Sequence, residues 1–191
     1  MKTRREFVKS MGLACAGLAA LRGSAGTVAG TKKIPVGIQL YSFRKQGEKD
    51  FAGIIQKAGE LGFSGVEFAG YGPYGDKPAE LKKLLDDAGL KAFGTHTGYN
   101  LIQPDQIRKT MDFHKAIGCP YIIVPWIDPK QMAVKDTCLK IAEVLTRASE
   151  TAQAEGLYVG YHAHGGDFHK IDGDRTAWEV LFDHTPKAFI H

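Results

Sequence analysis

The 191-residue chain contains few cysteines and lacks several short motifs that mark common enzyme classes. Its three cysteines are Cys15, Cys119 and Cys138. These are too few for a disulfide framework, so we interpret the last two as buried free thiols, with a bridge between them in an oxidising compartment as the alternative. No G-x-S-x-G elbow, P-loop, H-E-x-x-H or C-x-x-C occurs, so none of these hydrolase, nucleotide, zinc-protease or redox signatures is matched.

The chain also lacks an apolar run of bilayer length. The short apolar run 11–21 follows a twin-arginine pattern, Thr3-Arg4-Arg5-Glu6-Phe7-Val8-Lys9. This order predicts a Tat-type signal peptide over residues 1–29, cleaved near Thr27-Val28-Ala29. We therefore expect the Tat export machinery as a partner, a periplasmic or other extracytoplasmic location, and no stable membrane anchor. A weak lipoprotein box ending at Cys15 leaves lipidation as the alternative.

An excess of one charge is absent once the predicted signal is set aside. The whole chain has 25 Lys and Arg against 21 Asp and Glu, but residues 1–29 contain five of the basic residues and one of the acidic residues. The remaining 162 residues carry 20 of each, and their formal net charge is near zero. This balance gives no electrostatic reason to expect nucleic acid as a partner.

Apolar β-rich runs alternate with helical patterns from residue 30 onward, which is typical of a parallel sheet with crossover helices. The predicted strands are 35–42, 65–69, 91–97, 121–126 and 157–164, and a sixth strand begins at 188–191. The predicted helices are 50–61, 78–88, 105–117, 134–155 and 176–184. Asp50 is the expected N-cap of the first helix, and Gly62 is expected to end it. His114, in the third helix, is interpreted as a surface or helix-packing residue.

Residues 30–191 are too few for a closed (β/α)8 barrel, which typically needs about 250 residues and rarely fewer than about 200. We therefore predict an α/β fold of the TIM-barrel type, truncated after about five βα units and the start of strand six. This partial barrel forms one domain over residues 30–191. A complete, open doubly wound sheet is the alternative.

In four predicted strands a glycine lies two residues before a polar or aromatic residue, and therefore on the same face. The pattern is Gly37-Gln39-Tyr41, Gly65-Glu67, Gly94-His96 and Gly160-His162-His164. Small residues inside a barrel make room, and polar groups beyond them surround one mouth. We therefore expect Gln39, Tyr41, Glu67 and His96 to converge on one site. The alternative is that the glycines only mark strand starts and bulges.

The segment Gly160–His169 places three imidazoles and a carboxylate after an apolar strand. His162 and His164 share one face of the strand, and the glycines after them allow a tight turn that can return Asp167 toward both. These groups suit a divalent metal such as zinc or manganese, and neutral histidines also act as acids, bases or hydrogen-bond partners of a sugar. The alternative is a polar loop with surface histidines.

The chain resembles the sugar phosphate isomerase/epimerase family of xylose isomerase-like TIM barrels, in its exported type with a twin-arginine signal. The resemblance runs from Ile34 to the end of the chain. It is carried, in this order, by Val36–Arg44, Gly62–Glu67, Ile117–Pro125 and Gly160–His164.

This resemblance implies a divalent metal ion, manganese, zinc or cobalt, at the carboxyl-terminal mouth of the barrel. It implies Asp167 as the metal ligand after strand five, where the family usually has Glu, while Ala163 replaces the usual Asn. The other three ligands, an Asp, a His and a Glu or Gln, are expected beyond His191.

The implied chemistry is proton transfer next to a carbonyl group of a sugar or keto-sugar, with isomerisation, epimerisation or elimination as the outcome. Asp167 is then a ligand and a candidate base, and His162 and His164 are acid/base groups or substrate contacts. The substrate-binding residues are Gln39, Tyr41, Glu67, His96 and Trp126, with Trp126 packing on a sugar face. The competing interpretation is a non-catalytic exported module that binds a sugar or a partner. A third, a metal-dependent abasic-site nuclease, is disfavoured by export and by the neutral charge. Homo-oligomer formation is left open.

Overall fold

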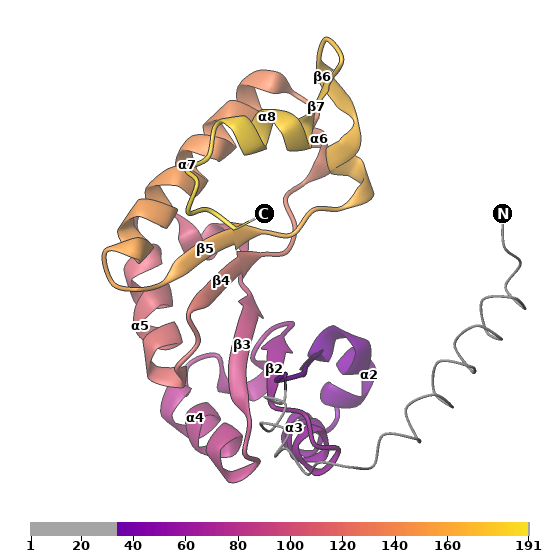
Figure 1. Cartoon of the computed structure of the whole chain (residues 1–191), viewed down its shortest axis with the longest axis vertical. Coiled ribbons are helices and arrows are strands. Elements are labelled where there is room, and N and C mark those ends of the chain that lie inside the picture. The colour runs from indigo at the N-terminus through magenta and orange to yellow at the C-terminus, as the bar shows by residue number, and fades with distance from the viewer. Residues whose placement is uncertain (1–33, 191) are drawn as a thin grey trace, which may run out of the picture. The chain divides into compact units, whose positions relative to one another are not determined.

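The computed structural model describes residues 34–190, so the predicted signal peptide lies outside the described residues. Five parallel strands form one sheet in chain order: β1 (Gly37–Gln39), β2 (Gly65–Phe68), β3 (Lys91–His96), β4 (Tyr121–Val124) and β5 (Tyr158–Tyr161). The helices are α2 (Arg44–Gly47), α3 (Phe51–Glu60), α4 (Pro78–Asp87), α5 (Ile107–Ile117), α6 (Pro129–Met132), α7 (Lys135–Gln153) and α8 (Ala177–Asp183). Each strand is followed by helical structure before the next begins, which confirms the α/β fold of TIM-barrel type (Figure 1).

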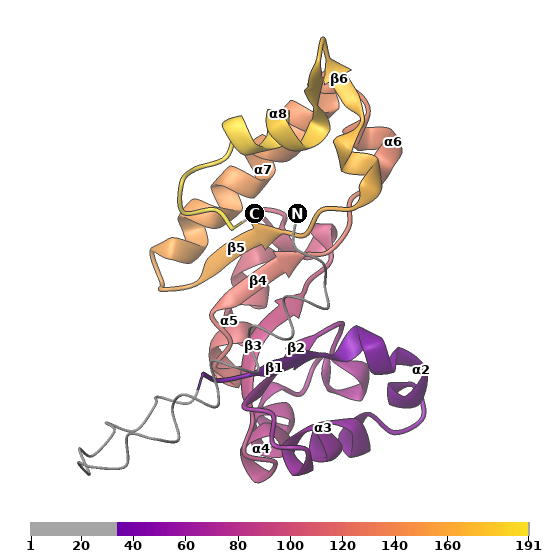
Figure 2. The same ribbon diagram turned by 45° about the vertical axis from the view of Figure 1, so that its right-hand side comes forward.

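Helices cover one face of this sheet. Figure 1 shows α4, α5 and α7 along that face, and the turned view in Figure 2 shows β1 and β5 at opposite edges of the sheet. Two apolar clusters lie between the helices and the strands. One contains Val66 and Phe68 of β2 with Leu81 of α4, and the other contains Val159 of β5 with Leu145 of α7. Burying these side chains stabilises the fold by roughly 1.5–3 kcal/mol each.

The opposite face of the sheet carries the glycines that the sequence singled out. A Cβ atom built on Gly37 would lie 2.5 Å from the ring of Phe93, and one on Gly65 would lie 2.7 Å from the same ring. On Gly94 it would lie 3.3 Å from the Glu67 side chain. The prediction that these small residues make room inside the barrel is therefore confirmed.

A register shift between β2 and β3 decides which side chains of β3 face the barrel interior. Val66 pairs with Ala92, but Glu67 pairs with Gly94, so Phe93 is an extra residue opposite β2. Because side chains alternate along a strand, an extra residue reverses the faces of all residues after it. Without this bulge, the face that holds Glu67 would receive Thr95 in place of His96.

Local signals set several element boundaries as predicted. The carboxylate of Asp50 accepts a hydrogen bond from the Gly53 amide at 2.8 Å and caps α3. Gly62 follows the helix with φ +83°, which favours glycine. Ile190 pairs with Gly160 as an isolated parallel bridge, in agreement with the predicted start of a sixth strand.

Other boundaries differ from the prediction. The predicted helix 134–155 is confirmed as α7, but a separate short helix before it, α6, capped by Asp128, was not predicted. The segment before α8 contains an antiparallel hairpin, β6 (Lys170–Asp172) and β7 (Arg175–Thr176), that the sequence pattern did not predict. Among residues 34–190, the helices are too short or too polar to cross a bilayer.

His114 of α5 is buried, which decides between its two predicted positions in favour of helix packing. Its Nε2 lies 2.6 Å from the Thr95 hydroxyl and 3.2 Å from the Tyr71 hydroxyl, and its Nδ1 lies 2.7 Å from the Thr110 carbonyl oxygen. A carbonyl accepts only, so Nδ1 carries the proton and Nε2 accepts from the hydroxyls. Burial lowers the pKa of His114 to about 4.

Candidate active site at the strand ends

A cavity of about 520 Å³ lies at the carboxyl ends of the parallel strands. Residues at or just after the carboxyl end of each of the five strands line it. They are Gln39, Tyr41, Glu67, Ala69, His96, Pro125, Trp126, His162 and His164. Seven of the eight site residues predicted from the sequence are in this set, and Asp167 is not. The structure therefore brings together residues from five strand ends that are up to 125 positions apart in the chain.

The centre of the cavity contains a chain of hydrogen bonds from β1 to β3. Gln39 Oε1 accepts from the Tyr41 amide at 2.7 Å, which leaves the Gln39 amino group as the donor to Glu67 Oε1 at 2.5 Å. The same carboxylate oxygen lies 3.2 Å from Nε2 of His96. The bonds from His96 and Gln39 lower the pKa of Glu67, although partial burial opposes them. Glu67 is therefore an anion that two donors hold in place.

Two further imidazoles adjoin this chain. The rings of His96 and His162 are 5.3 Å apart between centroids, and those of His162 and His164 are 5.0 Å apart. Partial burial lowers the pKa of His162, and the neighbouring imidazoles lower it further. A neutral His162 is thereby favoured at neutral pH, and a neutral imidazole accepts a proton or donates one.

Exposed aromatic side chains flank the cavity. Trp126 is 55% exposed and Tyr41 is 56% exposed, which is high for rings of this size. The guanidinium of Arg44 lies 4.5 Å from the centre of the Tyr41 ring and donates to the Tyr41 carbonyl at 3.0 Å. Flat apolar surfaces beside polar donors are suited to the alternating C–H and O–H groups of a sugar.

Asp167 lies on the other side of strand β5 from His162. Its side chain is 1% exposed, and Oδ2 accepts from the Tyr161 hydroxyl at 2.9 Å and from the His164 amide at 2.7 Å. Tyr161 is part of the apolar cluster under α7 and α8, on the helix side of the sheet. The glycine turn does return Asp167 toward the strand, as expected, but to the face of Tyr161.

The described residues do not by themselves form the divalent metal site that the sequence resemblance implies, three of whose four ligands are expected beyond His191. A divalent ion needs several oxygen or nitrogen ligands around one point. Between residues 34 and 190, no group of three or more His, Cys, Asp or Glu side chains is arranged to hold one. The Asp167 carboxylate is buried and already bonded to two donors, so this placement does not favour its expected ligand role.

Two lining residues, Ala69 and Pro125, were not predicted as part of the site. Each lies two positions beyond an inward-facing residue, Glu67 in β2 and Ile123 in β4. The same period of two that identified the other residues would have identified both. The sequence therefore contained the pattern that identifies these two residues, but neither side chain has a polar or ionisable group, so they were not selected as site residues.

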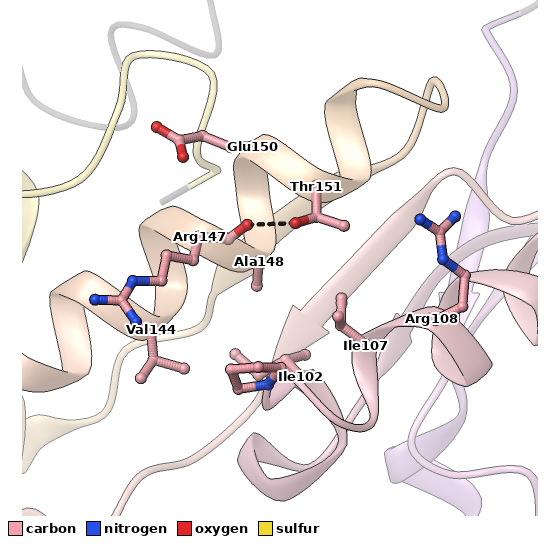
Figure 3. A pocket seen from close by; sticks show the side chains of 9 residues that line it. Ile102, Ile107, Arg108, Val144, Arg147, Ala148, Glu150 and Thr151 are labelled. Carbon is pink, nitrogen blue, oxygen red and sulfur yellow. Dashed lines mark hydrogen bonds between the residues drawn. The ribbon is translucent and has the colours of Figure 1, made fainter.

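A second cavity, of about 450 Å³, lies between α5 and α7 on the helix side of the fold (Figure 3). Its base is aliphatic, from Ile102, Ile107 and Val144, and Arg108 and Arg147 extend beside it. Arg108 pairs with Glu155. The residues that line this cavity include no imidazole or thiol.

A family model of the xylose isomerase-like TIM barrel matches residues 55–187. A comparison with curated proteins finds no match. Among solved structures, a sugar phosphate isomerase/epimerase from Parabacteroides distasonis ATCC 8503 is similar, with a TM-score of 0.70 and 20% identity. The match covers 86% of this chain and 68% of that one.

Two other similar structures have described ligands or roles of their own. A xylose isomerase-like TIM barrel protein from Mycobacterium smegmatis, in complex with magnesium, has a TM-score of 0.57 at 14% identity, over 82% of this chain and 63% of that one. The probable 3-DHS dehydratase AsbF from Bacillus anthracis has a TM-score of 0.58 at 16% identity, over 83% and 62%. At these identities the similarity to solved structures shows the fold alone. The family model matches more than half of the chain, and the chain therefore belongs to the xylose isomerase-like TIM barrel family.

Proposed function

We propose that the protein is an isomerase- or epimerase-like enzyme that moves a proton on a carbon next to a carbonyl group of a sugar or keto-sugar. The observation that carries this proposal is the Glu67–His96 pair, which shares one cavity with His162. An anion, an imidazole bonded to it and a second imidazole with a lowered pKa are the groups that general acid–base catalysis uses. The family match supports the same class of reaction.

His96 is the proposed proton acceptor. Its Nε2 lies against the Glu67 carboxylate, which only accepts hydrogen bonds, so the ring proton is on Nε2. The lone pair is then on Nδ1. When Nδ1 takes a proton from carbon, the imidazolium that forms is stabilised by Glu67 at the other end of the ring. Gln39 holds the carboxylate in position for this step.

His162 is the proposed second proton carrier. Because its pKa is lowered, it is available as a neutral ring on the same face of the sheet as His96. It can exchange a proton with the carbonyl oxygen or with the neighbouring carbon as the enediol forms and collapses. Return of the proton to the neighbouring carbon gives isomerisation, whereas return to the original carbon from its opposite face gives epimerisation. The probable dehydratase among the similar structures supports elimination as a further outcome of the same proton abstraction.

The proposal is tested with the full chain in D₂O and a panel of aldoses, ketoses and 3-keto sugars, with and without added Mg²⁺ or Mn²⁺. Incorporation of deuterium next to the carbonyl is followed by NMR. We expect incorporation with the wild type and a loss of about 10²-fold or more in His96→Gln and His162→Gln, the usual contribution of a general base. His169→Gln, an exposed histidine outside the cavity, is the matched control.

The alternative is a module on the same fold that binds a sugar without chemistry. The exposed rings of Trp126 and Tyr41 favour sugar binding whether or not a reaction follows. Binding of a sugar with no deuterium incorporation under any of these conditions would support this alternative and overturn the enzymatic proposal.

We also propose that the protein is exported by the Tat machinery. The proposal depends on the twin-arginine pattern and apolar run of residues 1–29, which lie outside the described residues. Residues 1–29 fused to a reporter should deliver it across the membrane, and Arg4→Lys with Arg5→Lys should retain it inside the cell. Delivery that is unaffected by both substitutions would contradict this.

A further inference from the structure

Asp167 connects the two ends of the segment that carries His162. Its Oδ2 accepts from the side chain of Tyr161, immediately before His162, and from the backbone amide of His164, two residues after it. The Asp167 amide in turn donates to the His164 carbonyl at 2.9 Å. Three hydrogen bonds therefore link one buried residue to the exit of β5.

These bonds act on the helix side of the sheet, whereas the two histidines are at the cavity. Tyr161 is held on that side by the ring of Trp178, with centroids 6.3 Å apart, and by the apolar cluster around it. Burial and the adjacent Asp167 raise the pKa of Tyr161, so its hydroxyl remains a donor. Since successive side chains of a strand point to opposite faces, fixing Tyr161 inward fixes His162 outward.

The turn that carries Asp167 is also supported from a second element. The 3₁₀ turn Gly165–Phe168 contacts α6, and a Cβ atom on Gly166 would lie 3.2 Å from Pro129. A buried carboxylate is unfavourable without its donors, so the turn and the strand exit are held in one arrangement.

We propose that Asp167 is a positioning residue that holds His162 and His164 at the cavity from the opposite face of the sheet, and is not a ligand of a metal ion. This inference depends on the proposed function only in assigning a role to the two histidines. The disagreement between the buried, doubly bonded carboxylate and the expected metal ligand is its starting point.

The test compares Asp167→Asn, Asp167→Ala and Tyr161→Phe in the full chain. Asn retains one oxygen that can accept both hydrogen bonds, but it lacks the negative charge of a metal ligand. The readouts are the imidazole NMR signals of His162 and His164, assigned with His162→Gln and His164→Gln, and the Mn²⁺ content and affinity of each purified variant. Tyr158→Phe, on the same strand but exposed, and Asp174→Asn, in the hairpin turn, are the controls.

Positioning predicts that Tyr161→Phe and Asp167→Ala shift and broaden both imidazole signals, that Asp167→Asn restores them toward the wild-type spectrum, and that Mn²⁺ binding is the same in all three. Loss of Mn²⁺ in both Asp167 variants but not in Tyr161→Phe, with unchanged imidazole signals in Tyr161→Phe, would overturn the proposal. If Asp167→Ala does not fold, the imidazole signals and Mn²⁺ binding of Tyr161→Phe, which lacks only one hydroxyl group, still test the proposal. The comparison needs no sugar, so it is informative even if no turnover is found.

Discussion

Oε1 of Glu67 lies 3.2 Å from Nε2 of His96, although the two residues are on different strands and 29 positions apart. The sequence predicted both residues only as substrate-binding groups, whereas the structure shows that they form a carboxylate–imidazole pair. The proton position on His96, and with it the proposed direction of proton transfer, follows from this contact.

Replacing His96 with Ala should raise the pKa of Glu67 toward the ordinary value of 4.5. The hydrogen bond from His96 is the largest cause that lowers it, and the variant removes this donor. A pH titration of the Glu67 side-chain carboxyl carbon by NMR measures the midpoint. His169→Gln should leave it in place, and an unchanged midpoint in His96→Ala would show that the pair does not form.

Binding of a sugar should change the fluorescence of Trp126 but not that of Trp178, the other tryptophan of the chain. Trp126 is at the cavity, whereas Trp178 packs against Tyr161 on the helix side. The signal should persist in Trp178→Phe and disappear in Trp126→Phe. In Trp126→Ala we expect about tenfold weaker binding, which corresponds to about 1.4 kcal/mol. A signal that depends on Trp178 would place the sugar elsewhere.

Substituting Gly65 with Ala should destabilise the fold by about 1–3 kcal/mol, because the new methyl group overpacks a filled interior. Its Cβ would lie 2.5 Å from the Lys91 carbonyl oxygen and 2.7 Å from the Phe93 ring. Gly75→Ala is the matched control, since its Cβ would meet nothing within 4 Å. Urea unfolding measures both. Equal stability of the two variants would contradict the tight packing of Phe93.

Acid should destabilise the protein through His114. Its folded-state pKa is about 4 against 6.5 for the free side chain, so the unfolded chain takes up a proton first as the pH falls. Stability is fully present above about pH 6.5 and is lost between there and pH 4, by up to about 3 kcal/mol.

The measurement is the free energy of unfolding in urea at several pH values, for the wild type and His114→Gln. The stability advantage of the wild type over the variant should shrink as the pH falls from 7 to 4, and then stay constant. His169→Gln, whose side chain is exposed, should keep the wild-type dependence. A wild-type advantage that stays the same over this range would show that His114 titrates normally.

Much of the fold could be predicted because its signals are local. Asp50 caps α3 through a hydrogen bond three residues away, and Gly62 ends it with a positive φ. The hairpin before α8 was missed since its two short strands, of three and two residues, carry no alternation long enough to detect.

The sequence by itself determined the order of the five βα units and the alternation that points Gln39, Glu67, His162 and His164 to one side of the sheet, because both depend on neighbours along the chain. Only the tertiary structure decided the rest. The extra residue Phe93 in β3 turns His96 to the same side, and a bulge depends on the pairing with β2. Asp167 is buried on the helix side of the sheet because Tyr161, which donates a hydrogen bond to it, lies there. The sequence spacing suggested a metal ligand at this position, whereas in the fold Asp167 lies behind the site and is proposed to support it.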